Sequence, residues 1–356
     1  MSGQRWQALD RVFDAALQSG ATPGASLLVA RGREVLLERC YGLVENGGPP
    51  VCETTLYDLA SLTKPLATLP ALLILAAAGR LDLDAELAGL VGHRSGLPAW
   101  KPYYESLGAT ATTASPAPAT AAARRQVLDL AQSEALEGTP GGRAVYSDVG
   151  YIRLGRIVEE VVAGRAGRLD EFVGEAFFGL LEGCKLRFVN TGLGQTPLAR
   201  AAPCGYSAWR GETVRGTVCD DNAYALGGVA GHAGLFGTAA DVHAVVAEYL
   251  AAYQGRGRVL DTDLVRRCWQ RPEGTSGSDS WRLGWDSPTA GESTAGTLIS
   301  DNSVGHLGYT GTSVWVDLER GVHVVLLTNR VHPDWSNRGI DSLRPAVHDA
   351  VFEALA

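Results

Sequence analysis

Residues 61–79 read SLTKPLATLPALLILAAAG. From Pro65 to Ala78 every position except Thr68 is apolar, which is typical of a helix buried on all sides and not of an amphipathic surface helix. The run is shorter than the roughly 20 apolar residues of a membrane span, so we expect no membrane insertion. Gly79 predicts the end of the helix, and Pro70 predicts a kink within it.

Ser61 and Lys64 stand three residues apart at the start of this run. If the helix begins at or just before Ser61, both side chains share one face of its first turn. A serine hydroxyl becomes a nucleophile when a base takes its proton, and a partly desolvated lysine can be that base. An unrelated surface serine and lysine would give the same pattern. Lysine occurs only at Lys64, Lys101 and Lys185, and this scarcity favours the catalytic interpretation.

The composition is typical of a soluble globular protein whose partner is a small molecule. The chain has 356 residues, 46% of them hydrophobic, and a formal net charge of -8, which argues against nucleic acid as the main partner. Residues 1–20 contain no continuous apolar segment of the signal-peptide type, so we expect a cytoplasmic location. No C-x-x-C pair occurs, so we expect neither a zinc site nor a thioredoxin-like motif but simple thiols at Cys40, Cys52, Cys184, Cys204, Cys219 and Cys268.

Strand patterns lie at both ends of the chain, and helical patterns lie between them. A hairpin is predicted at residues 25–30 and 34–41, and two further strands at 312–316 and 322–328. Apolar residues at helical spacing predict helices within residues 1–20, 124–135, 149–162, 238–253 and 342–355. Thr238 and Asp241 resemble a capping box at the start of one of these helices.

This order predicts an α+β fold in which an antiparallel sheet, built from both chain ends, is flanked by helices and carries a mainly helical insertion. Residues 1–90 and 226–356 would form the sheet domain and residues 91–225 the helical domain, with the active site in the cleft between them. We expect no clear strands between residues 163 and 222. Residues 108–123, rich in Ala, Thr and Pro, predict a flexible surface loop.

Two further motifs accompany the S-x-x-K sequence at 61–64. Tyr146-Ser147-Asp148 precedes a helix that Ser147 or Asp148 can cap, and residues 304–311 (VGHLGYTG) stand at the head of a C-terminal strand. With these three motifs in this order, the chain resembles the β-lactamase-like serine hydrolases, the superfamily of penicillin-binding proteins, class C β-lactamases and family VIII carboxylesterases. The resemblance covers nearly the whole chain.

The resemblance implies a role for each motif residue. Ser61 would be the nucleophile that forms an acyl-enzyme, Lys64 its proton acceptor, and Tyr146 the residue that shares this proton and passes it to the leaving group. The backbone amides of Ser61 and Tyr309 would form the oxyanion hole. We also expect Lys64 to lower the pKa of the Tyr146 phenol from its reference value of about 10.

Departures from the family pattern bear on the substrate. Penicillin-recognising members usually have Lys-Thr-Gly where this chain has His306-Leu307-Gly308, which we expect to contact substrate together with Asp148. Leu307 has no side-chain donor, and His306 is mostly neutral at pH 7, so strong binding of a substrate carboxylate is not expected. Asp148, where many members have Asn, orients Lys64 but repels an anionic substrate. Both changes favour a neutral ester.

Other chemistries receive less support from the sequence. G-x-S-x-G and H-E-x-x-H are both missing from the chain. We interpret His93 and His232 as turn-stabilising residues and Asp220-Asp221 as a loop or helix cap, so we predict no metal and no cofactor. The predicted function is a serine hydrolase acting on small acyl esters. A β-lactamase or D-alanyl-D-alanine-type peptidase, and an inactive member that binds a ligand in the same cleft, remain alternatives.

Overall fold

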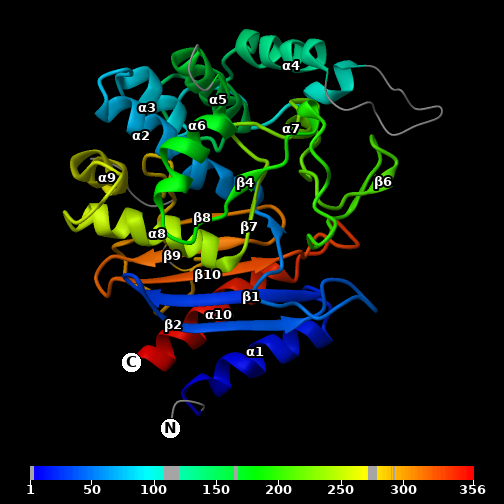
Figure 1. Cartoon of the computed structure of the whole chain (residues 1–356). Helices are drawn as coiled ribbons and strands as arrows, with labels where there is room; N and C mark the ends of the chain where they lie inside the picture. The colour runs from blue at the N-terminus through cyan, green and yellow to red at the C-terminus, as the bar shows by residue number, and fades with distance from the viewer. Residues whose placement is uncertain (1–3, 108–119, 164–166, 272–278, 290, 292) are drawn as a thin grey trace.

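A five-stranded antiparallel sheet lies at the centre of the computed structural model, which describes residues 4–107, 120–163, 167–271, 279–289, 291 and 293–356 (Figure 1). The strand order is β2-β1-β10-β9-β8. The strands are β1 (Gly24–Arg31), β2 (Glu34–Gly42), β8 (Ser303–Leu307), β9 (Ser313–Asp317) and β10 (Val322–Thr328). Leu28 of β1 pairs with Val325 of β10, so the two chain ends build one sheet, which confirms the predicted α+β fold.

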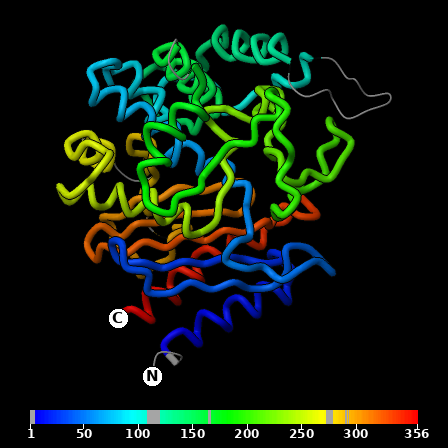
Figure 2. The backbone as a smooth tube through the Cα atoms, viewed as in Figure 1, coloured from blue at the N-terminus to red at the C-terminus, as the bar shows by residue number. Residues whose placement is uncertain are grey.

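Helices cover both faces of this sheet. Leu27 and Val29 of β1 pack with α1 (Gln7–Gln18) and α10 (Ile340–Leu355), while Leu28 and Ala30 belong to the core on the opposite face. This alternation follows from the two-residue period of a strand. The second face is covered by α8 (Ala239–Tyr253), whose start carries the capping box predicted at Thr238 and Asp241. In Figure 2, α1 and α10 lie on one side of the sheet and the remaining helices on the other.

The apolar run at residues 65–78 lies in the core of the second layer. The chain passes through a 3-10 turn (Ala60–Leu62) and a π-helix (Lys64–Thr68) into α2 (Leu69–Ala77), and Gly79 follows with φ +65°. Pro70 lies in the first turn of α2, where its missing N–H costs no helical hydrogen bond. The irregular part of the helix is the π-helix directly before α2. Within the described ranges, the one helical stretch long and apolar enough to span a membrane, Ala60–Ala77, is 78% buried in the fold.

Shorter elements complete the second layer around α2. They are α3 (Ala85–Val91), α4 (Ala121–Ser133), α5 (Asp148–Val162), α6 (Leu169–Ala176), α7 (Asp221–Ala225) and α9 (Thr262–Trp269), with β3 (Tyr57–Asp58), β4 (Arg187–Phe188), β5 (Tyr206–Ser207), β6 (Glu212–Thr213) and β7 (Leu235–Gly237). The strands β3, β7 and β4 form one small sheet, and β5 pairs with β6.

Two predictions for the middle of the chain need correction or restriction. The expectation of no strands between residues 163 and 222 was wrong: β4, β5 and β6 lie there, but each has two residues, too few to show an alternating pattern. Of the predicted loop at 108–123, residues 108–119 lie outside the described residues, and α4 begins at Ala121 behind the cap Thr120. The division into domains at 90/91 and 225/226 stays a prediction.

Candidate active site

Ser61 lies in the middle of the 3-10 turn that joins β3 to the π-helix. Its neighbour Ala60 has φ +48°, a left-handed conformation that non-glycine residues adopt rarely and that is often found at functional sites. Two hydrogen bonds hold this turn: the Ala60 amide donates to Oδ1 of Asp58 (2.8 Å), and Oγ1 of Thr63 donates to the Ala60 carbonyl oxygen (2.6 Å). The turn therefore fixes the backbone on both sides of Ser61.

Lys64 contributes a completely buried amine directly beside Ser61. Its Nζ atom donates to Oγ of Ser61 (2.9 Å), to Oδ1 of Asp148 (2.6 Å) and to the carbonyl oxygen of His232 (3.1 Å). Burial lowers the pKa of Lys64 from its usual value, and the carboxylate of Asp148 opposes this shift. The predicted pair is thus in contact, and burial favours the neutral amine that can accept the proton of Ser61.

Tyr146 stands two residues before α5, whose start is capped by the Ser147 side chain as predicted. Nζ of Lys64 lies 4.8 Å from the centroid of the Tyr146 ring. Removal from water raises the pKa of the Tyr146 phenol well above its ordinary value, Asp148 adds to this, and a hydrogen bond with Ser61 only partly opposes it. The expectation that Lys64 lowers this pKa was therefore wrong, because desolvation is the larger effect. Tyr146 is a neutral phenol that can donate a proton.

The third motif leads into β9, the strand predicted at 312–316, and its first residues belong to β8, a strand that the sequence did not predict. Oγ1 of Thr310 donates to the Asp58 carbonyl oxygen (2.8 Å), and Oγ1 of Thr312 donates to the Leu59 carbonyl oxygen (3.1 Å). A Cβ atom at Gly308 would lie 2.7 Å from that Leu59 oxygen, so the close approach requires glycine here. These contacts bring Tyr309 and the Ser61 turn together.

Tyr309 itself extends into solvent with 59% of its surface exposed. Its ring stacks against Trp335 at a centroid distance of 6.0 Å, and the guanidinium of Arg330 lies 4.7 Å from its centroid. Among the described residues its backbone N–H has no acceptor. The amide is thus free to bind an oxygen atom of a substrate.

His306 is buried beside Tyr146 and Trp281, with ring centroids 6.0 and 5.6 Å away. Its Nδ1 lies 2.9 Å from the carbonyl oxygen of Leu307, which can only accept, so Nδ1 carries the hydrogen. Burial lowers the pKa of His306 to about 3, and Lys64 contributes to this shift. The remaining atom, Nε2, has no partner among the described residues. His306 therefore presents a neutral hydrogen-bond acceptor.

Residues of all three motifs line one cavity of about 800 Å³. Its wall includes every residue predicted to contact substrate, Asp148, His306, Leu307 and Gly308, together with Ser61, Tyr146 and Tyr309. Other aromatic rings in the wall are those of Trp100, Tyr104, Tyr206, Trp209, Trp281 and Trp335, and its carboxylates belong to Asp58, Asp148, Asp220, Asp221, Asp286 and Asp341. The cavity therefore combines an apolar surface with an excess of acidic groups.

The histidines that the sequence analysis set aside lie close to the site but make structural contacts. Nδ1 of His93 accepts the Ser147 amide (3.0 Å), and Nε2 of His232 lies 2.9 Å from Oδ1 of Asp220. Asp220 caps α7, and a helix cap was one of the two interpretations of Asp220-Asp221 in the sequence. These contacts agree with the interpretation of both histidines as residues that hold turns, with His232 also presenting its carbonyl oxygen to Lys64.

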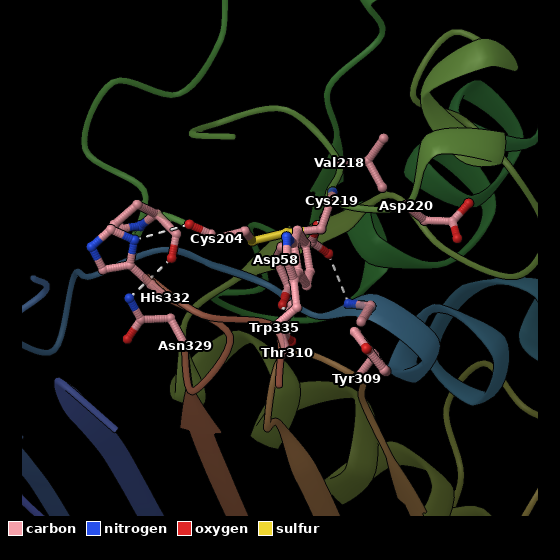
Figure 3. Close-up of a disulfide and its surroundings, with 12 residues drawn as sticks. Asp58, Cys204, Val218, Cys219, Asp220, Tyr309, Thr310, Asn329, His332 and Trp335 are labelled. Atoms are coloured by element: carbon pink, nitrogen blue, oxygen red, sulfur yellow. Dashed lines mark hydrogen bonds between the residues drawn. A yellow bond between two sulfur atoms is a disulfide. The ribbon is translucent and has the colours of Figure 1, made fainter. Parts of the chain in front are cut away.

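The prediction of six free thiols was wrong for one pair. Cys204 and Cys219 form a disulfide beside Asp58, and Cys219 reaches the cavity wall (Figure 3). Their separation of 15 residues is not a recognised metal or redox spacing, so only the fold reveals the pairing. Within the described residues, Asp58, Cys204 and Cys219 are the one group close enough to share a metal ion, and the disulfide withholds both sulfurs as thiolate ligands.

A sequence model of the Beta-lactamase family matches residues 9–347. The protein therefore belongs to the Beta-lactamase family and is a serine hydrolase by type. A relative from Escherichia coli O157:H7, provisionally named a D-alanyl-D-alanine carboxypeptidase, is 30% identical over 92% of this chain and 83% of its own.

Solved structures show the same fold at lower identity. EstCE1, described as a hydrolase with promiscuous acyltransferase activity, superposes with a TM-score of 0.72 at 20% identity, over 98% of this chain and 99% of its own. Simvastatin synthase (LovD) from Aspergillus terreus, unliganded, gives a TM-score of 0.68 at 18% identity, over 98% of each chain.

Proposed function

We propose that the protein is an esterase that forms an acyl-enzyme on Ser61 and acts on small neutral esters with an apolar acyl group. The observation that carries this proposal is the contact of 2.9 Å between Oγ of Ser61, which lines the cavity, and Nζ of Lys64, an amine buried directly behind it. A desolvated amine next to a serine hydroxyl can act as the general base that activates this nucleophile.

In the acylation step, the neutral amine of Lys64 takes the proton from Oγ of Ser61 as this oxygen attacks the ester carbonyl carbon. The carbonyl oxygen becomes an oxyanion, which the amides of Ser61 and Tyr309 would stabilise. As the tetrahedral intermediate collapses, the bond to the alkoxide breaks and Tyr146 donates the proton that this oxygen needs. Lys64 returns its proton to Tyr146, and water then releases the acid by the same route.

The charges of the cavity support a neutral substrate. The imidazole of His306 is uncharged at neutral pH, and the side chain of Leu307 cannot donate a hydrogen bond, so neither side chain attracts a carboxylate. The acidic groups in the wall repel an anion further. In contrast, Nε2 of His306 can accept a hydrogen bond from a hydroxyl or amide group of the substrate.

The names of the relatives favour a second candidate, a D-alanyl-D-alanine carboxypeptidase. Arg330 and Arg344 are among the residues that line the cavity, as Tyr309 is, and they could supply the positive charge that a C-terminal carboxylate needs. Their hydrogen bonds run to backbone carbonyl oxygens, which include those of Tyr309 and Gly308. Because these contacts already occupy part of each guanidinium, we rank this activity second.

The test is a parallel assay of p-nitrophenyl butyrate, a D-alanyl-D-alanine peptide and nitrocefin with the wild type and Ser61→Ala. Ester turnover that disappears in the variant, with little turnover of the other two compounds, is the expected result. Dominant release of D-alanine or opening of the β-lactam ring would replace the esterase assignment. If wild type turns over none of the compounds and a fluorophosphonate does not label Ser61, the cleft binds ligand without catalysis. Faster product formation with an added alcohol would identify acyl transfer.

A further inference from the structure

Asp58 lies at the junction of three segments that meet behind the nucleophile. Its carboxylate is buried, and each oxygen accepts a different backbone amide: Oδ1 that of Ala60 (2.8 Å) and Oδ2 that of Cys219 (2.6 Å). Its own carbonyl oxygen accepts the hydroxyl of Thr310 (2.8 Å). One residue thus joins the Ser61 turn, the third motif and the disulfide loop.

These contacts determine the positions of the two amides proposed for the oxyanion hole. Ala60, held by Oδ1, directly precedes Ser61, and its left-handed conformation needs a partner to keep it in place. Thr310, held by the carbonyl oxygen, directly follows Tyr309. A shift of Asp58 would therefore move both amides relative to a bound substrate.

The disulfide restrains the remaining partner of Asp58. Cys204 is held from several sides, because its amide donates to Val214 (2.8 Å) and its carbonyl oxygen lies 2.9 Å from Nδ1 of His332. The bond from Cys204 to Cys219 ties the amide that Asp58 accepts to this fixed point (Figure 3). Opening the bond removes the link between Cys219 and the Cys204 segment, while the guanidinium of Arg210 still donates to the carbonyl oxygens of Val218 (2.7 Å), Cys219 (3.2 Å) and Asp220 (3.1 Å).

We propose that Asp58 is a positioning residue that couples the Cys204–Cys219 disulfide to the nucleophile Ser61, so that acylation is fast when the disulfide is closed and slow when it is open. This inference rests on the proposed acyl-enzyme but not on the choice of ester. The coupling runs from Cys219 through the carboxylate to Ala60, and from the Asp58 carbonyl oxygen to the loop that carries Tyr309.

The burial of this carboxylate agrees with a positioning role. Burial raises the pKa of Asp58 to about 6, and neighbouring Asp220 adds to the shift while Arg210 opposes it. A carboxyl whose folded pKa exceeds its reference value contributes stability that is lost as the pH rises through about 6. At neutral pH the charged form therefore lowers stability while it holds two amides in place.

The experiment measures the rate at which a fluorophosphonate labels Ser61, before and after reduction by dithiothreitol. In the reduction the S–S bond breaks, each sulfur receives a hydrogen, and dithiothreitol gives up two electrons and closes to its cyclic disulfide. We expect reduction to slow wild-type labelling roughly tenfold, since small displacements of catalytic groups have large effects on rate. Before reduction, Asp58→Asn should be labelled about as slowly as reduced wild type, and reduction should change its labelling rate less than about twofold.

Two variants serve as matched controls. Asp317→Asn alters another buried carboxylate that accepts backbone amides, at the far end of β9 from the site, and should label at the wild-type rate. Cys52→Ser removes an exposed free thiol and should keep the full response to dithiothreitol. The double variant Cys204→Ala/Cys219→Ala provides a second route if Asp58→Asn does not fold: it should label as slowly as reduced wild type, with or without dithiothreitol.

Steady-state kinetics separate positioning from a structural role. In Asp58→Asn we expect kcat for the ester to fall while KM stays within about twofold, because the acyl pocket is intact. Two results would overturn the coupling. One is a labelling rate of wild type that does not change after complete reduction, and the other is a reduced Asp58→Asn variant slowed by the product of the two separate effects. Labelling of Ser61 without ester turnover would refute the esterase proposal alone, since the labelling rates still test the coupling.

Discussion

The Nζ atom of Lys64 lies 2.6 Å from Oδ1 of Asp148, and the lysine side chain of this pair is completely buried. A buried ammonium is stabilised by a neighbouring carboxylate, whereas burial alone favours the neutral amine. Asp148 thus sets the balance between the two protonation states of the residue that activates Ser61.

Replacing Asp148 should therefore shift the pH dependence of acylation. Asp148→Asn removes the negative charge that raises the pKa of Lys64, so this pKa falls further and the neutral amine forms at lower pH. We expect the rising limb of the profile of kcat/KM against pH to move to lower pH. Glu137→Gln, which breaks the exposed pair with Lys101, should leave the midpoint unchanged. A midpoint that moves to higher pH would contradict the assigned role of Lys64.

Lys64→Arg tests the base itself. Arginine keeps the positive charge beside Asp148 but does not deprotonate at neutral pH, so Ser61 loses its proton acceptor. We expect kcat/KM for the ester to fall about 10³-fold, within the usual range for loss of a general base. Lys101→Arg on the surface should retain activity. If Lys64→Arg keeps more than a tenth of the wild-type value, the proton of Ser61 goes elsewhere.

His306→Lys with Leu307→Thr tests the basis of substrate choice. The two changes restore a cation and a hydroxyl donor at the third motif, so a substrate carboxylate gains a partner. We expect KM for nitrocefin to fall roughly tenfold or more, since hydrogen bonds to charged groups contribute about 1.5–3 kcal/mol, and turnover of neutral esters to decline. An unchanged KM for nitrocefin would show that the neutral His306 does not limit carboxylate binding.

Gly308→Ala and Gly174→Ala form a matched pair that separates the site from the rest of the fold. A Cβ atom at Gly308 would lie 2.0 Å from Oγ1 of Thr312, so we expect the loop that carries Tyr309 to shift and activity to fall about 100-fold. Gly174, inside α6, has nothing within 4 Å of its Cβ position, and alanine there should raise the free energy of unfolding by about 1 kcal/mol. Equal activities of both variants would contradict the tight contact at Gly308.

The sequence alone predicted the features that local patterns encode. The hairpin at 25–41, the cap at Ser147 and the buried helix after Lys64 follow from alternation, capping chemistry and an unbroken apolar run. The spacing of Ser61 and Lys64 also predicted their contact, because a single helical turn sets the distance between them.

Features that depend on distant residues were missed. The role of Asp58 depends on Cys219 and Thr310, which reach it only through the fold. The raised pKa of Tyr146 likewise reflects desolvation by neighbours that no local pattern reveals. The nearest signal in the sequence was the position of Asp58 three residues before Ser61. Aspartate is too common for this spacing alone to indicate a function.

The pairing of Leu28 with Val325 has a consequence for synthesis of the chain on the ribosome. Strands β1 and β2 are made before the whole second layer, and β10 is made after it, so one edge of β1 stays unpaired in the meantime. Thr310 and Thr312, which hold the turn before Ser61, arrive equally late. A nascent chain therefore leaves an apolar strand edge unpaired until β10 has been made, and the turn that carries Ser61 gains its last hydrogen bonds only when the third motif has been made.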